Sequence, residues 1–316
     1  MRISVILCTH NRCQTLVNAL KSVSHSILPQ AVTWEVLVVD NNSNDRTKEV
    51  VEDLCRRFPN RFRYLFERQP GKSNALNTGI REARGEVLAF VDDDVVVEAT
   101  WLQNLTAPLL NGECVGAGGR ILPEHGFTPP RWFPLNDRHA LAVLALFDLG
   151  PIPGRLTEPP FGTNMAFQKE IFERYGGFRT DLGPSPGSRI RNEDTEFGLR
   201  LLSAKETLRY EPSAVVYHLV PQNRLTKKYF SEWTFDKGRA DVREFGIEPT
   251  TKWFFASIPC YGFRRLAIWA LRWLISFDPR RRFSCRLKAL YAAGQIVECY
   301  GQSCKTNGHR QKFAQL

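Results

Sequence analysis

Apolar runs and helix-like stretches alternate along the first hundred residues. Four runs, rich in β-branched and aromatic residues, have the length and composition of buried strands: 3–7, 36–39, 62–66 and 87–91. Three stretches between them carry apolar residues at helical spacing: 15–25, 46–57 and 73–84. Strands that alternate with such helices predict an α/β fold, in which a central, mostly parallel sheet is flanked by helices.

Polar side chains end three of the four predicted strands. Thr9, Asp40 and Asp92 follow the first, second and fourth runs. Because ligands bind at the carboxyl ends of the strands in such sheets, we expect these residues to share a site. The glycine-rich turn of dinucleotide-binding folds and the P-loop are both missing after the first strand, which argues against those two classes.

Three consecutive carboxylates, Asp92, Asp93 and Asp94, stand directly after the fourth strand. Close like charges repel one another, and a divalent cation such as Mg²⁺ or Mn²⁺ can hold them together. Such sites usually share the metal with substrate phosphates. A solvated acidic turn is the alternative for a triplet taken by itself.

The pattern weakens between residues 110 and 160, where glycine and proline accumulate around a short predicted helix at 140–147. Further strands are predicted at 161–167 and 215–219, with a helix at 192–202 between them. We expect the irregular region to face the substrate.

Seven short motifs give the chain a resemblance to the family 2 glycosyltransferases, which have the GT-A fold. In order they are Ser4 to Arg12; Val38 to Asn41 with Ser43 and Asp45; Gly71 to Asn77; Phe90 to Asp94; Gly162 to Met165; Gly176 to Phe178; and Glu193-Asp194. Each motif alone is a weak signal, and the resemblance becomes specific because all seven occur in the family's order and at its spacing. It implies a Rossmann-like catalytic domain over residues 1–220, with a nucleotide-binding half (1–100) and an acceptor-binding half (101–220).

The resemblance also implies a donor site for a nucleotide sugar, here expected to be a UDP-sugar. The residues implied for nucleotide binding are Thr9, Arg12, Asp40, Asp92 and Asp93, and a surface charge is the alternative for Arg12. Lys72 is a further candidate for this site through a contact with phosphate, and a solvated lysine is its alternative. Asp94, with Asp92 directly or through water, is expected to hold Mg²⁺ or Mn²⁺ and so to neutralise the departing diphosphate. His218 is the third candidate ligand, and a structural histidine is its alternative.

Asp194 is the candidate catalytic base. A sugar hydroxyl is a poor nucleophile and must lose its proton as it attacks, and a carboxylate within reach is the usual solution. The resemblance places Asp194 opposite the leaving group, which implies a single displacement with inversion. Thr163, Asn164 and Glu193 are expected to line the acceptor site. For Glu193 the alternative is a charge that the helix dipole favours at an N-terminus.

We therefore expect a non-processive transferase that acts on a saccharide or a lipid-linked saccharide. The Gln-x-x-Arg-Trp signature of processive members is not formed, since Gln222, Arg224 and Trp233 stand at other spacings. A nucleotidyltransferase that makes a nucleotide sugar is the alternative enzyme class, although Cys8 to Arg12 lack the glycines of a triphosphate loop. A non-catalytic, membrane-docked partner in glycan assembly is the third hypothesis.

Charge is distributed unevenly along the chain. Residues 1–220 hold 25 Lys and Arg against 26 Asp and Glu, whereas residues 221–316 hold 18 against 7. This asymmetry indicates a polyanionic partner for the C-terminal extension. Nucleic acid is not expected, because no recognised binding motif accompanies the charge.

The C-terminal extension, residues 221–316, contains an amphipathic stretch at 263–277. Trp269 and Trp273 fall on its apolar face, and the cluster Arg280 to Arg282 follows. This arrangement predicts attachment to an anionic membrane surface, and a helix packed on the catalytic domain is the alternative. With no signal peptide, no span-length apolar run and scattered cysteines, we expect a cytoplasmic enzyme that is peripheral on the inner face of the membrane.

Overall fold

The computed structural model describes residues 2–135, 137–185, 191–246, 252–255 and 258–313, with side chains up to residue 302. The chain divides into two compact units. The first comprises Met1–Phe127, Ala145–Ser188 and Glu193–Val220, and the second comprises Thr128–Leu144, Arg189–Asn192 and Pro221–Leu316. The second unit thus joins two internal segments to the C-terminal helices.

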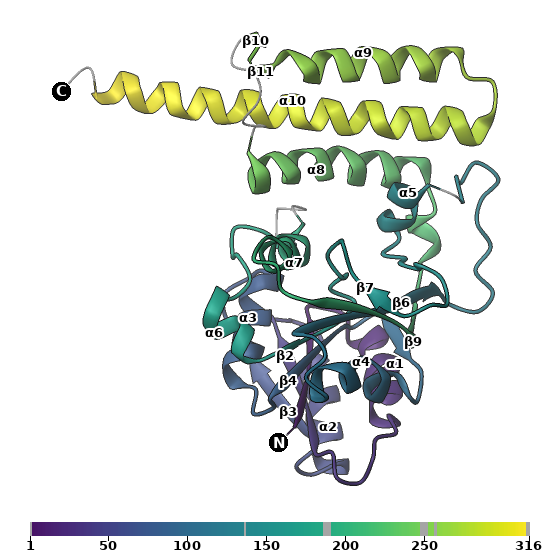
Figure 1. Cartoon of the computed structure of the whole chain (residues 1–316), viewed down its shortest axis with the longest axis vertical. Helices are drawn as coiled ribbons and strands as arrows, with labels where there is room; N and C mark the ends of the chain where they lie inside the picture. Colours follow the sequence, from purple (N-terminus) through teal and green to yellow (C-terminus); the bar gives the residue numbers. More distant parts are fainter. Residues whose placement is uncertain (1, 136, 186–190, 247–251, 256–257, 314–316) are drawn as a thin grey trace. The chain divides into compact units, whose positions relative to one another are not determined.

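The first half of the first unit is the predicted α/β array (Figure 1). Its elements in chain order are β1 (Ile3–Thr9), α1 (Cys13–Ser24), β2 (Trp34–Asp40), α2 (Thr47–Arg57), β3 (Phe62–Phe66), α3 (Lys72–Glu82) and β4 (Val87–Asp92). The four strands pair in parallel in the order β3-β2-β1-β4. All seven residues of β2 are buried, as expected for a parallel strand that is covered on both faces.

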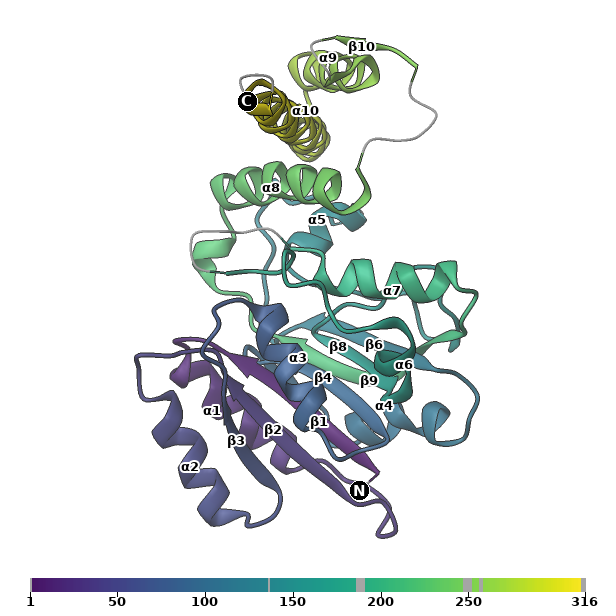
Figure 2. The same cartoon turned by 90° about the vertical axis from the view of Figure 1, so that its left-hand side faces the viewer.

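The second half of this unit continues the same sheet. Its elements are β5 (Val95–Val97), α4 (Trp101–Leu110), β6 (Gly116–Pro123), β7 (Gly154–Arg155), β8 (Asn164–Gln168), α6 (Glu170–Tyr175), α7 (Glu193–Ser203) and β9 (Leu208–His218). The strand order runs on from β4 as β8-β6-β9-β5, with β7 paired to β9. The strands β4, β8, β6 and β9 are labelled in Figure 2. Because β8 is antiparallel to β4 and to β6, this half of the sheet is mixed. The predicted α/β class is confirmed, while β5, α4, β6, β7 and α6 are additions to the prediction.

Aromatic side chains join the sheet to the helices of the second half. Phe90 of β4 lies with its ring centroid 5.7 Å from that of Phe178, and Phe172 stacks on Phe197 at 4.7 Å. All four rings are buried. Ring pairs of this kind add to the apolar burial that holds α6 and α7 on the sheet.

The second unit is mainly helical. Its elements are α5 (Arg138–Val143), the short 3₁₀ helix η1 (Gln222–Arg224), α8 (Lys227–Phe245), β10 (Phe254–Phe255), β11 (Ile258–Pro259), α9 (Cys260–Ile275) and α10 (Pro279–Phe313). The expected helices at 140–147 and 263–277 correspond to α5 and α9. Within this unit α10 packs against both α8 and α9. None of the helices in the described part of the chain is long and apolar enough to cross a membrane.

Two glycines let α8 and α10 approach backbone to backbone. A Cβ atom built on Gly238 would lie 2.2 Å from the carbonyl oxygen of Tyr291, and one built on Gly294 would lie 2.1 Å from the carbonyl oxygen of Phe235. Real side chains cannot occupy such positions, so the two helices can keep this spacing only with glycine at both points.

We expect Gly294→Ala to lower the free energy of unfolding of the second unit by about 1–3 kcal/mol, because the added methyl group must push α10 away from α8. Gly301→Ala is the matched control on the same helix, since a Cβ there meets nothing within 4 Å. That control should be neutral or stabilising, by up to about 1 kcal/mol, through its better helix propensity. Thermal or urea denaturation followed by circular dichroism measures both, and equal stability of the two variants would contradict the close approach.

Candidate active site

The carboxyl ends of three neighbouring strands meet at one edge of the sheet. In the strand register Thr9 of β1 lies opposite Asp40 of β2, and Cys8 lies opposite Asp92 of β4. The structure thus brings together the polar residues that end the predicted strands.

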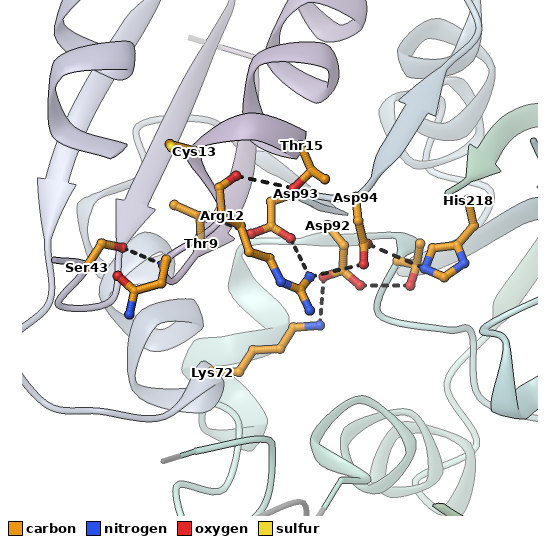
Figure 3. A network of polar contacts seen from close by, with 12 residues as sticks. Thr9, Arg12, Cys13, Thr15, Ser43, Lys72, Asp92, Asp93, Asp94 and His218 are labelled. Carbon is orange, nitrogen blue, oxygen red and sulfur yellow. Dashed lines mark hydrogen bonds and ion pairs between the residues drawn. The ribbon is translucent and has the colours of Figure 1, made fainter. Parts of the chain in front are cut away.

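Arg12 lies among the carboxylates of the Asp triplet (Figure 3). Its Nη1 donates to Asp93 Oδ1 at 2.9 Å and to Asp94 Oδ2 at 3.0 Å. Thr9 Oγ1 donates to the other oxygen of Asp93 at 2.7 Å. Burial raises the pKa of Asp93 to about 6, although the guanidinium of Arg12 opposes the shift. Arg12 therefore supplies the positive charge that holds two buried carboxylates side by side.

Lys72 is the second fixed cation of the site. Its Nζ donates to Asp92 Oδ1 at 2.7 Å and lies 3.7 Å from Glu193 Oε1. Burial alone would lower the pKa of Lys72, but Asp92 and Glu193 outweigh it and hold that pKa above its ordinary value. The ammonium group links the end of β4 to the start of α7.

The backbone before α3 explains how Lys72 reaches this position. Gly71 has φ +125°, a conformation that L side chains rarely adopt, and its N–H donates to Asn41 Oδ1 at 2.8 Å. The Asn41 amide also donates to the carbonyl oxygen of Gln69 at 2.7 Å. Asn41 thus ties the segment before α3 to the end of β2.

Asp40 is buried at the end of β2, and each of its carboxylate oxygens accepts a hydrogen bond from a neighbouring residue. The hydroxyl of Tyr64 donates to Asp40 Oδ2 at 2.8 Å, and the N–H of Ser43 donates to Oδ1 at 2.9 Å. These bonds fix the carboxylate and shape the turn after β2. Its proposed contact with the base of a nucleotide stays a prediction.

Asp194 lies in the first turn of α7 and is half-buried. Its Oδ2 accepts from the N–H of Gly162 at 2.7 Å, and its Oδ1 accepts from the N–H of Thr195 at 2.7 Å. Backbone donors on both oxygens, together with the positive end of the helix dipole, hold the side chain in one orientation. A carboxylate held in this way is well suited to take a proton from a bound hydroxyl.

His218 ends β9 beside Asp94. Its Nε2 lies 3.4 Å from Asp94 Oδ1, and its Nδ1 is buried and meets no hydrogen-bond partner among the described residues. An unpaired buried ring nitrogen costs free energy, so a ligand close to the histidine would stabilise the site.

A divalent cation fits this chemistry, because Asp94 and His218 offer an oxygen and a nitrogen next to each other. Among the residues that the structure describes, no group of three His, Cys, Asp or Glu side chains is arranged to hold a metal by itself. A Mg²⁺ or Mn²⁺ ion that shares its coordination with substrate phosphates needs only one or two protein ligands.

Three of the residues assigned to the acceptor lie inside the protein. Thr163 is buried and its Oγ1 donates to Asp92 Oδ2 at 2.8 Å, so it orients that carboxylate. Asn164 is fully buried; its Oδ1 accepts from Trp101 Nε1 at 2.8 Å and its Nδ2 donates to two backbone carbonyls. Glu193 is buried beside Lys72, and burial raises its pKa to about 7. The side-chain polar atoms of Thr163 and Asn164 thus serve contacts inside the protein, and the acceptor-binding role of all three residues stays a prediction.

Two residues near the site carried no assignment from the sequence. Tyr64 holds Asp40, and Asn41 holds the segment that leads into α3. Asn41 stands in one of the sequence motifs, and that position could have identified it as a residue of the site. Tyr64 gave none beyond its place in a strand, because its partner lies 24 residues away.

Glycosyl transferase family 2 matches residues 4–176, which is more than half of the chain. The succinoglycan biosynthesis protein ExoM of Rhizobium meliloti is 27% identical over 244 residues, which cover 77% of this chain and 75% of that protein.

Solved structures show the same fold at low sequence identity. A mannosyltransferase of Pyrobaculum calidifontis, in complex with GDP-Man and Mn²⁺, superimposes with a TM-score of 0.59 at 19% identity and covers 100% of this chain and 81% of its own. Residues 1–349 of S. aureus TarS, in complex with UDP, superimpose with a TM-score of 0.51 at 17% identity, over 96% of this chain and 92% of that one. At these identities the likeness concerns the fold, which is the GT-A fold expected from the sequence.

Proposed function

Because this chain belongs to glycosyl transferase family 2, we propose that it moves a sugar from a UDP-sugar to a saccharide or lipid-linked saccharide, with inversion at the anomeric carbon. Glycosyl transfer from a nucleotide sugar follows from the family. The donor base, the stereochemistry and the acceptor are the proposal.

The observation that carries the proposal is the fixed Asp194 carboxylate in the unit that also holds the Asp92–Asp94 cluster. As the acceptor oxygen bonds to the anomeric carbon, Asp194 takes the hydroxyl proton. The bond from that carbon to the diphosphate oxygen breaks at the same time, and the nucleoside diphosphate leaves with the bonding pair. One displacement of this kind inverts the anomeric configuration.

Negative charge that develops on the leaving diphosphate needs compensation. Arg12 and Lys72 are already held at the strand ends by carboxylates, so they cost little reorganisation when a phosphate approaches. Asp94 and His218 would hold Mg²⁺ or Mn²⁺, with Asp92 directly or through water; when bound, the ion supplies further charge neutralisation. The Mn²⁺ in the Pyrobaculum enzyme's complex supports this assignment.

Thr9, Asp93 and Asp40 complete the proposed nucleotide slot. Asp93 pairs with Arg12 and Thr9, which makes it an anchor for the arginine that faces the diphosphate. UDP in the TarS complex supports a uridine donor. Because the Pyrobaculum complex contains GDP-Man, guanosine donors should be tested beside uridine donors. The role of ExoM in succinoglycan biosynthesis supports a saccharide product.

A donor panel tests this function. The protein is incubated with Mn²⁺, a set of UDP- and GDP-sugars and short saccharide acceptors, and the released UDP, GDP or pyrophosphate is quantified. We expect UDP release that depends on the acceptor, and a product whose anomeric configuration is opposite to the donor's by NMR. Pyrophosphate release from a nucleoside triphosphate and a sugar phosphate would instead identify a nucleotidyltransferase. No turnover of any donor would favour the non-catalytic assembly partner.

We place this transfer at the cytoplasmic face of a membrane, where a lipid-linked acceptor would be presented. The support is the excess of 18 Lys and Arg over 7 Asp and Glu in residues 221–316. We propose that the enzyme is a peripheral protein of that membrane.

A further inference from the structure

Helix α9 is apolar on two opposite faces, and the described residues pack against only one of them. The inner face packs on α10: Gly262 is buried, while Trp269 and Trp273 are half-buried. Cations of α10 lie over both indole rings, with Lys288 Nζ 4.5 Å from the centroid of Trp269 and Arg286 Cζ 5.7 Å from that of Trp273. The two tryptophans therefore fasten α9 to α10 and are not the membrane-facing residues that the sequence suggested.

The outer face of α9 carries large aliphatic side chains that the described part of the chain leaves exposed. They form a stripe at helical spacing, and their exposed fractions are Ile268 40%, Leu271 61%, Leu274 67% and Ile275 61%. Phe277, directly after the helix, is 98% exposed. We call these five residues the outer stripe. A helix with one apolar face packed and another in water indicates a second partner for the free face.

Exposed aromatic residues extend this surface at the other end of α9. Trp253, Phe254 and Phe255 have exposed fractions of 79%, 49% and 70%. The N–H of Cys260 donates to the carbonyl oxygen of Trp253 at 2.9 Å, and the rings of Phe255 and Phe263 lie 6.2 Å apart. These contacts hold the aromatic segment beside the start of α9. Tryptophan and phenylalanine beside an apolar helix face are typical of the membrane–water interface.

Charge selects among the possible partners of this surface. Residues 252–288 contain nine Lys and Arg and one acidic residue, Asp278. Arg264, Arg265 and Arg272 are exposed on α9 itself. A second copy of this chain would present the same positive charge and repel the first, whereas an anionic lipid surface attracts it. Nucleic acid would satisfy the charge but offers no apolar medium for the outer stripe.

We propose that α9 lies in the interface of an anionic lipid bilayer, with the outer stripe and the Trp253–Phe255 segment inserted below the headgroups. The arginines that flank the stripe would then lie at the level of the lipid phosphates. This inference adds a docking surface to the proposed membrane location and does not depend on the identity of donor or acceptor.

Co-sedimentation of the full chain with vesicles tests the surface directly. One vesicle set is phosphatidylcholine alone, and the other is phosphatidylcholine mixed with phosphatidylglycerol. We expect binding to the mixed vesicles that weakens as salt rises without vanishing, because apolar insertion is not screened. Leu271→Glu with Leu274→Glu should reduce partitioning about a hundredfold or more, since each leucine loses its apolar transfer. Arg281→Glu with Arg282→Glu should reduce it about twentyfold or more at low salt.

Ile27→Glu is the matched control, because Ile27 is 59% exposed and lies outside the second unit. It should bind vesicles like the wild type. All variants are checked by circular dichroism and by activity on a soluble acceptor, which should be unchanged. The inference is overturned if the wild type ignores anionic vesicles, if the leucine variant binds as well as the wild type, or if light scattering shows a dimer that the leucine variant dissociates. Activity lost with vesicle binding intact would count against the proposed function and leave the docking surface standing.

Discussion

Asp94→Ala is expected to abolish sugar transfer and metal-dependent nucleotide binding together. Asp94 is buried between Arg12 and His218, the two groups that would neighbour a metal–diphosphate complex. Charge neutralisation of a leaving diphosphate is worth several kcal/mol, so turnover should fall by about 10³-fold or more. Turnover and titration of UDP with and without Mn²⁺ measure the two effects.

Asp53→Ala is the matched control for that experiment. Asp53 is an exposed aspartate on α2 that pairs with the surface residues Arg56 and Arg57, so its loss should leave both readouts unchanged. Full activity of Asp94→Ala, or of the wild type in EDTA, would remove Asp94 from the proposed metal site. A melting temperature close to that of the wild type is required before the loss is read as functional.

Asp194→Asn is expected to keep donor affinity and to lose turnover. The asparagine can still accept a hydrogen bond from the N–H of Gly162, so the start of α7 should stay in place. It cannot take the acceptor proton, and removal of a general base lowers kcat by roughly 10²-fold or more. Single-turnover kinetics and UDP binding separate the two effects.

Glu196→Gln provides the comparison on the same helix turn. Glu196 forms a partly buried ion pair with Arg200 along α7, and a glutamine can still accept a hydrogen bond from that guanidinium, so kcat should stay within about twofold. Weakened UDP binding in Asp194→Asn at unchanged kcat would contradict the assignment of the base. A product that retains the donor's anomeric configuration would also contradict it.

The parallel half of the sheet was predictable because each strand is a compact apolar run between helical stretches. β6 was not, because Gly116, Gly118 and Gly119 contribute no apolar side chain to the pattern. The structure supplies the reason for those glycines: a Cβ on Gly119 would lie 2.2 Å from the carbonyl oxygen of Ala214 in β9. Close packing of backbones is therefore a cause of strand formation that hydrophobic periodicity does not register.

The site was only partly predictable for a related reason. Motifs place Asp92, Asp93 and Asp94 at a strand end, but they do not show that Arg12, some eighty residues earlier, donates to two of these carboxylates. Likewise, Asn164 stands in a motif although all its polar atoms are engaged inside the protein. The sequence identifies which polar residues lie in the same region. The hydrogen-bond partners of each atom are needed to distinguish residues that face a substrate from residues that hold other side chains in place.

The same limit explains why Trp269 and Trp273 were expected to face the membrane although they pack on α10. Periodicity predicted a helix with large apolar residues over 263–277, and α9 occupies Cys260–Ile275. It could not tell which apolar side packs on α10, because Trp269 and Leu271 both suit a buried position. The contact between Lys288 and the Trp269 ring shows that the Trp269 side packs on α10, and Lys288 belongs to a different helix from Trp269.

The close crossing of α8 and α10 limits where this unit can change in length. Each helix is held at two points: Phe230 of α8 and Phe283 of α10 lie with ring centroids 6.2 Å apart, while Gly238 and Gly294 form the backbone contact. An insertion of one residue between Phe230 and Gly238 would turn the rest of α8 by about 100°. The ring contact and the glycine contact could then no longer form together. Natural insertions and deletions in related chains should therefore fall outside 230–238 and 283–294, near the helix ends.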